Sequence, residues 1–300
     1  MFNITSPYKG ILLMVVATLL FSIMHASIKH ISSEDIHPFE VAFFRNLFGL
    51  IVIAPWFIKH GIKPLVTKKI KLHFLRSFFN VVAMLTFFYA LSITPLAEVA
   101  SLAFTAPLFA TLLAIIFLGE KIGIRRSVAI IVGFIGAAIV VNPNFIAIDV
   151  GHLCVLISAS VWSVALIFIK ILGRTESSVT ITSYMVLFMI PLSGVVASFY
   201  WVMPGIQDLL ILAVIGISGT AAQMLLAQAL KEEDTGIIMP FDFLKLIWAV
   251  LIGYLVFSEF PTINTWIGSV IIFFSTLYVA YRERKVPPKI GKTITQPVDH

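Results

Sequence analysis

The stretch AEVASLAFTAPLFATLLAIIFLGEK, residues 97–121, is an apolar run that ends in a Gly-Glu-Lys step. A basic segment, IGIRR, follows it, and a second apolar run, SVAIIVGFIGAAIVV, extends to residue 141. A weaker copy begins 139 residues downstream, in GIIMPFDFLKLIWAVLIGYLVFSE and TWIGSVIIFFSTLYVAYRE. In that register Phe104 corresponds to Phe243, and Glu120 corresponds to Glu259. The chain therefore contains a repeated pair of apolar segments, each pair joined by a turn.

The composition places the chain in a lipid bilayer. Hydrophobic residues make up 59% and charged residues 12% of the sequence, and the mean hydropathy is +1.02. Soluble domains are about 45–50% apolar and about 25% charged. A membrane-spanning helix needs about 20 apolar residues, and charged or turn-forming residues divide this chain into ten such segments. The predicted all-α bundle has helices at residues 9–29, 38–58, 72–92, 96–118, 125–142, 151–172, 179–202, 209–230, 236–257 and 263–281.

Lysine and arginine are distributed unevenly between the connecting segments. If the N-terminus is cytoplasmic, all 21 basic residues except Lys29, Arg45 and Lys245 lie at the cytoplasmic side. Such enrichment is typical of cytoplasmic loops. We therefore expect a multi-pass membrane protein with both termini in the cytoplasm. The net charge of +6 is then a signal of topology, and we expect no nucleic-acid partner.

The repeat extends over the whole membrane part. FSIMHASIKHI at residues 21–31 matches WSVALIFIKIL at 162–172, so Lys29 corresponds to Lys170. This register predicts two five-helix halves, 9–142 and 151–281, followed by a cytoplasmic tail at 282–300. Because five is odd, the halves must lie upside down relative to each other. Inverted repeats with a binding site near the bilayer midplane are a transporter architecture.

The sequence contains no motif of a catalytic or metal centre. It lacks the GxxxxGK[ST] phosphate loop and the GxSxG and HExxH motifs. Its seven histidines show no metal-ligand spacing, and its one cysteine cannot form an internal disulfide. We therefore expect no cofactor, metal ion or catalytic residue, which favours a carrier driven by a gradient. A membrane-embedded lipid-modifying enzyme or a scaffold is the alternative of another class.

Asp242 and Lys245 form the sharpest charged pair within a predicted span. A charge inside a membrane span costs about 2.5–3.5 kcal/mol on insertion scales and usually has a function. The two residues are three positions apart, on nearly one helix face, and they follow Pro240. They are candidates to bind charged groups of a substrate, or to carry a coupling proton through Asp242. The alternative is an internal pair in which the two charges only neutralise each other.

Other charged residues in or near the spans have more ordinary interpretations. Arg45 could bind an anion, but a structural pair or an outward-snorkelling side chain is favoured. Glu98 is expected to cap a helix N-terminus. Glu120 and Glu259 are expected to be structural partners of nearby basic residues or of backbone donors in the adjoining turns.

Polar and aromatic side chains within the spans are candidates to line a cavity, although single polar residues often join membrane helices instead. These candidates are Phe21, His25, Asn80, Tyr89, Ser101, Thr105, Trp162, Ser163, Gln223, Gln228 and Phe243. The small residues of GFIGAA, 133–138, permit close helix contact, either within the bundle or between two copies in a homodimer.

The segments PLAEVASLAFTAPLFATLLAIIFLGE and VGFIGAAIVVNP, within two inverted five-helix halves, resemble the EamA family of the drug/metabolite transporter superfamily over residues 9–283. HPFEVAFFR is similar to bacterial S-adenosylmethionine importers, whereas PFDFLKL is more similar to riboflavin importers. The resemblance implies uptake of one of these compounds across the bacterial inner membrane, with export of amino acids or related metabolites as the alternative. It also implies a central cavity lined by His25, Asn80, Ser101, Thr105, Trp162, Gln223, Asp242, Phe243 and Lys245.

Overall fold

Helices account for all the regular structure in the part of the chain that the computed structural model describes, which is residues 8–33, 36–61, 65–118, 123–141, 149–173, 175–232 and 235–285. The first six are α1 (Lys9–Ser32), α2 (Pro38–His60), α3 (Ile70–Ile93), α4 (Leu96–Ala103), α5 (Ala106–Leu118) and α6 (Ile124–Val141). The second six are α7 (Val150–Leu172), α8 (Ser178–Ala197), α9 (Ile206–Glu232), α10 (Thr235–Asp242), α11 (Leu244–Phe257) and α12 (Ile263–Lys285).

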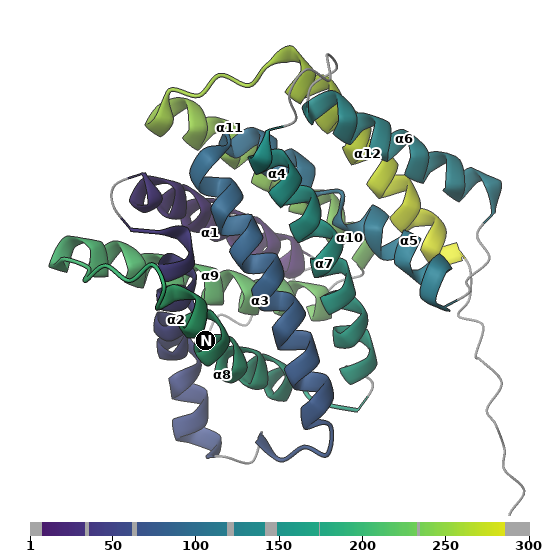
Figure 1. Ribbon diagram of the computed structural model, residues 1–300. Coiled ribbons are helices and arrows are strands. Elements are labelled where there is room, and N and C mark those ends of the chain that lie inside the picture. The colour runs from purple at the N-terminus through teal and green to yellow at the C-terminus, as the bar shows by residue number, and fades with distance from the viewer. Residues whose placement is uncertain are drawn as a thin grey trace, which may run out of the picture.

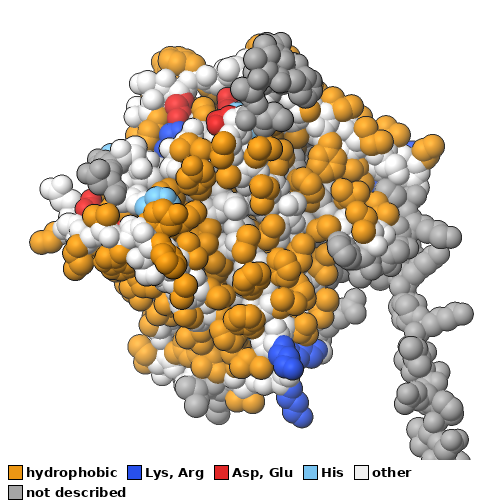
Figure 2. Space-filling view, viewed as in Figure 1, with side chains coloured by type: hydrophobic (Ala, Val, Ile, Leu, Met, Phe, Trp, Pro, Cys, Tyr) orange, Lys and Arg blue, Asp and Glu red, His pale blue; other side chains and the backbone are white. Residues whose placement is uncertain are grey.

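These helices contain ten membrane-length apolar spans among the described residues, which confirms the predicted number. Figure 2 shows hydrophobic side chains over most of the visible face, with the largest group of lysine and arginine side chains near the lower end and most acidic side chains, beside a smaller blue patch, near the upper end. An apolar belt between charged ends is the surface that a bilayer requires, because its hydrocarbon core offers no partners to charged groups.

Two of the predicted spans are not continuous helices. The span at 96–118 is broken between α4 and α5 at Phe104 and Thr105, and the span at 236–257 is broken between α10 and α11 at Phe243. In the first case Pro107 has no N–H to donate to the carbonyl of Ala103, and its ring would clash with that carbonyl in a continuous helix. The second break lies three residues after Pro240.

The backbone at the first break satisfies its own polar groups through tight turns. Phe104 N–H donates to the carbonyl of Ser101 (3.3 Å), and Thr105 N–H donates to that of Leu102 (3.0 Å). The Thr105 carbonyl accepts in turn from Leu108 N–H at 2.9 Å. In a membrane such irregular backbone is tolerated only where protein or a water-filled space surrounds it, so both breaks are expected in the interior of the bundle.

The predicted helix at 179–202 also ends earlier than expected, because α8 stops at Ala197. Phe199, Tyr200 and Trp201 follow as exposed residues outside the helix. Tyrosine and tryptophan favour the membrane–water interface, where one side of the ring is apolar and the other is wet. The N–H of Val202 donates a hydrogen bond to the carboxylate of Glu40 (3.1 Å), which takes the place of the backbone carbonyl that it would bond in a longer helix.

Helices α6 and α12 pack closely against each other at one edge of the bundle (Figure 1). A Cβ atom added to Gly268 would lie 2.5 Å from the carbonyl oxygen of Gly136, and one added to Gly136 would lie 3.0 Å from the carbonyl oxygen of Gly268. The two backbones approach so closely only because both positions lack a side chain. The expectation that the small residues of 133–138 allow close packing is therefore met within the bundle.

We expect Gly268→Val to lower the melting temperature of the purified protein in detergent, because its side chain must displace the backbone of α6. Overpacking of this kind costs about 1–3 kcal/mol. Gly123→Ala is the matched control, since an added Cβ there meets no atom within 4 Å. A Gly268→Val protein that melts with the wild type would contradict the close α6–α12 contact.

Candidate functional site

The two helix breaks meet each other through aromatic rings. Phe104 directly follows α4 and Phe243 directly precedes α11, and their rings stack with centroids 4.1 Å apart and planes 18° apart. Phe273 of α12 packs edge-on against Phe243, at 4.2 Å and 82°. Phe104 and Phe243 are the residues that the sequence register pairs, so the repeat-related positions of the two halves are in direct contact.

Asp242 and Lys245 flank the second break. Asp242 is the last residue of α10, Lys245 is the second residue of α11, and their side chains form an ion pair. The Lys245 ammonium also lies 4.6 Å from the centre of the Phe21 ring on α1, a cation–π distance. The predicted pairing of these charges is thus present, and both side chains retain some exposure, 20% for Lys245 and 15% for Asp242.

One face of α1 lines this region. Ser22 donates to the carbonyl of Lys245 (3.5 Å), and Thr18 accepts a hydrogen bond from the indole N–H of Trp248 (3.3 Å). His25 lies between Phe21 and Phe87, with ring centroids 6.3 and 5.1 Å away. The side chains of α1 at intervals of three and four residues therefore face α10, α11 and α3.

Arg45 is a second cation that interacts electrostatically with His25. Of the two interpretations that the sequence favoured for Arg45, the outward-snorkelling side chain is wrong. Its side chain is buried, with only 5% of the residue exposed, and its guanidinium donates to Asn46 Oδ1 (3.1 Å). Gly219 on α9 makes room for Met24 and Arg45, because an added Cβ there would lie 2.3 Å from Met24 Sδ and 3.3 Å from Arg45 Nε. Among the described residues no carboxylate lies within 4.0 Å of Arg45.

Three of the predicted site residues are engaged in contacts between or within helices. Ser101 shares a hydrogen bond with Ser269 of α12 (2.6 Å), and the buried Thr105 donates to the carbonyl of Leu102 (2.6 Å). The buried Asn80 donates to the sulfur of Met189 on α8 (3.0 Å). Trp162 on α7 and Gln223 on α9 are half-buried.

The structure therefore brings together Asp242, Phe243 and Lys245 at one break, with His25 on the facing helix. Sequence reasoning missed Phe104 and Arg45 as members of this region. The correspondence of Phe104 with Phe243 in the repeat was the available signal, because a residue on the axis of an inverted repeat contacts its own counterpart. No local pattern indicates that Arg45 points inward.

A second cluster of charges lies at one end of the bundle. The Lys29 ammonium at the end of α1 forms an ion pair with Glu259 and donates to the carbonyl of Thr94 (2.7 Å). The Glu259 carboxylate also accepts from Leu96 N–H (2.9 Å) at the start of α4. This confirms the prediction that Glu259 serves a basic residue and a backbone donor. Its counterpart Glu120 lies outside the described residues.

Glu98 makes contacts between helices at the same end of the bundle. It lies in the first turn of α4, where the helix dipole favours a carboxylate, but the expectation that it caps the helix is wrong, because the N-cap is Pro95 and no side chain makes a capping hydrogen bond there. Its carboxylate also hydrogen-bonds the imidazole of His152 on α7 (2.7 Å) and accepts from the hydroxyl of Thr265 on α12 (3.4 Å). Glu98 therefore connects three helices.

The opposite end carries an exposed pair between α1 and α9. Lys9 donates to Glu232 at 2.8 Å, and Gln228 donates to the same carboxylate at 2.6 Å. These hydrogen bonds, with that from Lys9 the larger cause, lower the pKa of Glu232 below its ordinary value. No group of three potential metal ligands occurs within the part of the chain that the structure describes.

Comparison with known proteins gives this helical bundle a family. The model of the EamA-like transporter family matches the chain twice, over residues 8–142 and 149–281. The chain belongs to the EamA-like transporter family. A solved structure with a TM-score of 0.62 and 19% identity covers 93% of this chain and is covered over 99% of its own length, which shows the same fold.

Two groups of named transporters are similar to this EamA-like chain. The S-adenosylmethionine uptake transporter of Rickettsia bellii is 32% identical over 274 residues, covering 90% of this chain and 94% of that protein. The riboflavin transporter of Vibrio cholerae is 31% identical over 283 residues, covering 93% of this chain and 95% of that protein. The riboflavin transporter of Brucella anthropi is 30% identical over 246 residues, covering 80% and 86%.

The Phe104–Phe243 stack can be tested by a double-mutant cycle in which each phenylalanine is replaced by leucine. We expect a coupling free energy of about 0.5–1.5 kcal/mol in thermal or denaturant unfolding, because each single change already removes the ring pair. The control cycle pairs Phe104→Leu with Phe199→Leu, since Phe199 is 80% exposed and lies outside the helices. Additive effects in the first cycle would contradict the stack.

Proposed function

We propose that this EamA-like protein is a secondary carrier that takes up a small organic metabolite across the inner membrane by alternating access. The observation that carries the proposal is the contact between the two helix breaks. Discontinuous membrane helices that meet at the interface of inverted repeats are where such carriers bind substrate. The two halves, 9–142 and 151–281, would move relative to each other about this contact, with both termini in the cytoplasm.

Riboflavin and S-adenosylmethionine are the leading substrates in this proposal, because similar transporters carry those names. Both compounds contain a flat heteroaromatic ring system, which can stack on phenylalanine rings such as those of Phe21, Phe104 and Phe243. Asp242 and Lys245 would orient the polar groups of the substrate. Because the two side chains form an ion pair with each other, substrate binding would exchange that pair for contacts with the substrate.

The choice between the two compounds turns on charge. The charges of Lys245 and Asp242 neutralise each other. Arg45 has no carboxylate within 4.0 Å among the described residues, so its positive charge is not neutralised by an ion pair there. A net positive region repels the sulfonium group of S-adenosylmethionine and accepts the neutral riboflavin more readily. This electrostatic argument favours riboflavin.

The deciding experiment measures uptake of labelled riboflavin and labelled S-adenosylmethionine by cells that express the protein, with and without a protonophore. We expect saturable accumulation of riboflavin and a loss of accumulation when the proton gradient is removed. Accumulation of S-adenosylmethionine alone would overturn the charge argument. No uptake of either compound, together with faster efflux of amino acids from preloaded cells, would favour export.

In the same assay Asp242→Asn and Lys245→Met should each lower uptake by about 10- to 100-fold, the equivalent of one hydrogen bond to a charged group. Asp208→Asn and Lys71→Met are matched controls, because these residues lie at the start of α9 and α3, away from the breaks. Recovery of uptake in the Asp242→Asn, Lys245→Met double variant would show that the pair only neutralises itself.

Alternating access also requires contacts that open and close at each end. The Lys29–Glu259 pair joins α1, α11 and the turn between α3 and α4, so we propose that it holds the outer end closed in this conformation. In the sequence register Lys29 corresponds to Lys170 and Glu259 to Glu120. An equivalent pair at the inner end in the opposite conformation is therefore the expectation from the repeat; Glu120 and the Lys170 side chain lie outside the described residues.

Labelling of a cysteine at the proposed site tests the outer closure. In a Cys154→Ser background, Phe21→Cys, at the half-buried position beside Lys245, reports entry of a membrane-impermeant maleimide from outside. Lys29→Gln or Glu259→Gln should each raise the labelling rate about tenfold, since a charge-assisted hydrogen bond is lost. The exchanged pair Lys29→Glu with Glu259→Lys should return labelling to a slow rate. An unchanged labelling rate in both single variants would contradict the proposal that this pair holds the outer end closed.

A further inference from the structure

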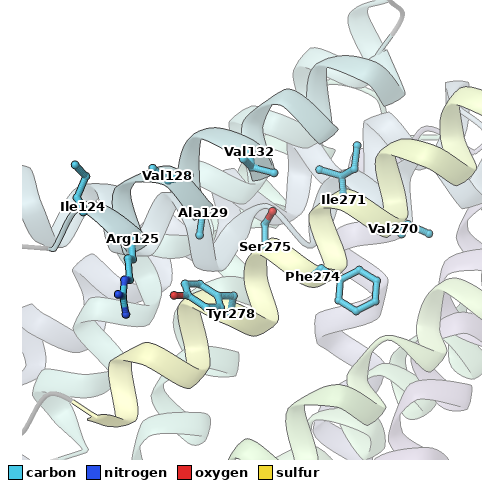
Figure 3. A pocket seen from close by; sticks show the side chains of 10 residues that line it. All are labelled: Ile124, Arg125, Val128, Ala129, Val132, Val270, Ile271, Phe274, Ser275 and Tyr278. Carbon is cyan, nitrogen blue, oxygen red and sulfur yellow. The ribbon is translucent and has the colours of Figure 1, made fainter.

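A groove runs between α6 and α12 on the outside of the bundle, away from the helix breaks. Its volume is about 780 Å³, within the range of about 300–1,000 Å³ that is typical of small-molecule sites. Figure 3 shows Val132, Val270 and Phe274 toward one end of it, and Arg125 and Tyr278 toward the other. The groove is thus apolar along its length and carries its charge at one end.

The apolar part of the groove faces outward from the protein. Val128, Val270 and Phe274 are 53%, 51% and 62% exposed. Both α6 and α12 are long and apolar enough to span a membrane, so these side chains lie at the depth of the lipid hydrocarbon. The groove therefore opens to acyl chains, and an acyl chain can fill it without leaving an apolar environment.

The charged end of the groove lies where the helices reach the basic side of the protein. Arg125 is exposed in the first turn of α6, and no carboxylate lies within 4.0 Å of it among the described residues. The guanidinium of Arg282 lies 5.9 Å from the ring of Tyr278, which also lines the groove. Arg126, the residue after Arg125, does not line the groove, and its guanidinium donates a hydrogen bond to the hydroxyl of Thr111 (3.3 Å).

We propose that this groove binds one acidic phospholipid. An acyl chain lies along Val128, Val132 and Phe274, and the phosphate sits between Arg125 and Arg282. Basic pockets between membrane helices on the cytoplasmic side recognise anionic headgroups, and each arginine near the surface adds to the attraction. The site is separate from the proposed transport site and holds whether or not the substrate assignment is correct.

A second copy of the chain fits this groove less well. In a dimer with a twofold axis along the membrane normal, each residue lies at the same depth as its copy. The arginines at the end of one groove would then lie beside those of the other, and like charges brought together oppose association. The charge of the groove therefore favours a lipid phosphate as its occupant.

Native mass spectrometry of the purified protein tests the proposal. Phosphatidylglycerol and phosphatidylcholine with the same acyl chains are added separately to protein in a neutral detergent. We expect phosphatidylglycerol to remain bound preferentially, and Arg125→Gln to lower its bound fraction about fivefold. Lys71→Gln, which removes an exposed lysine from α3, should leave the fraction unchanged. Inorganic phosphate at the same concentration should not displace the lipid.

A second variant distinguishes the contribution of the shape of the groove to lipid binding from that of the Arg125 charge. Ala129→Phe narrows the groove while keeping Arg125, and we expect it to lower binding of both lipids. If that protein fails to fold, melting curves of Arg125→Gln decide instead, because phosphatidylglycerol should stabilise the wild type more than this variant. Equal binding of both lipids, or no effect of Arg125→Gln, would overturn the proposal. So would dimers that Ala129→Phe converts to monomers, since the occupant would then be a second copy.

Discussion

The structure depends on the contact between two interrupted helices. Phe104 and Phe243 occupy corresponding positions in the repeat. They stack on each other at the break between α4 and α5 and the break between α10 and α11. A bilayer does not tolerate lipid-exposed irregular backbone, because unpaired peptide groups there cost several kcal/mol each. Each break must therefore be covered by protein, and each half of the chain supplies part of the cover for the other.

The same constraint explains why charge collects beside the breaks. Asp242 and Lys245 flank the second break, and His25 of α1 interacts electrostatically with Lys245 and with Arg45 of α2. Charged groups at this depth are stable only when they are paired, hydrogen-bonded or set against aromatic faces. Phe21 offers such a face to Lys245. The interior thus combines flat apolar surfaces with a few polar groups, the usual composition of a site for a small organic molecule.

The ends and the edge of the bundle serve different purposes. At one end Lys29, Glu259 and the backbone between α3 and α4 form a single hydrogen-bonded group, and Glu98 joins α4 to α7 and α12 nearby. At the edge, glycines on α6 and α12 bring two backbones into contact and leave an outward-facing groove. The edge pair contributes a stable, lipid-facing wall, whereas the end group consists of contacts that a change of conformation could exchange.

The sequence by itself determined the class of this protein. Apolar content, run length and the distribution of lysine and arginine are local properties, and they were sufficient to predict ten membrane helices. The repeat register also identified Phe104 and Phe243 as equivalent positions. Only the tertiary structure decided that these rings touch, that Arg45 points inward, and that the helices break at Phe104 and Phe243. It also decided that Ser101 turns toward α12 and Asn80 toward α8. These outcomes depend on which helix faces which side chain, and apolar periodicity carries little of that information when lipid and protein interior are equally hydrophobic.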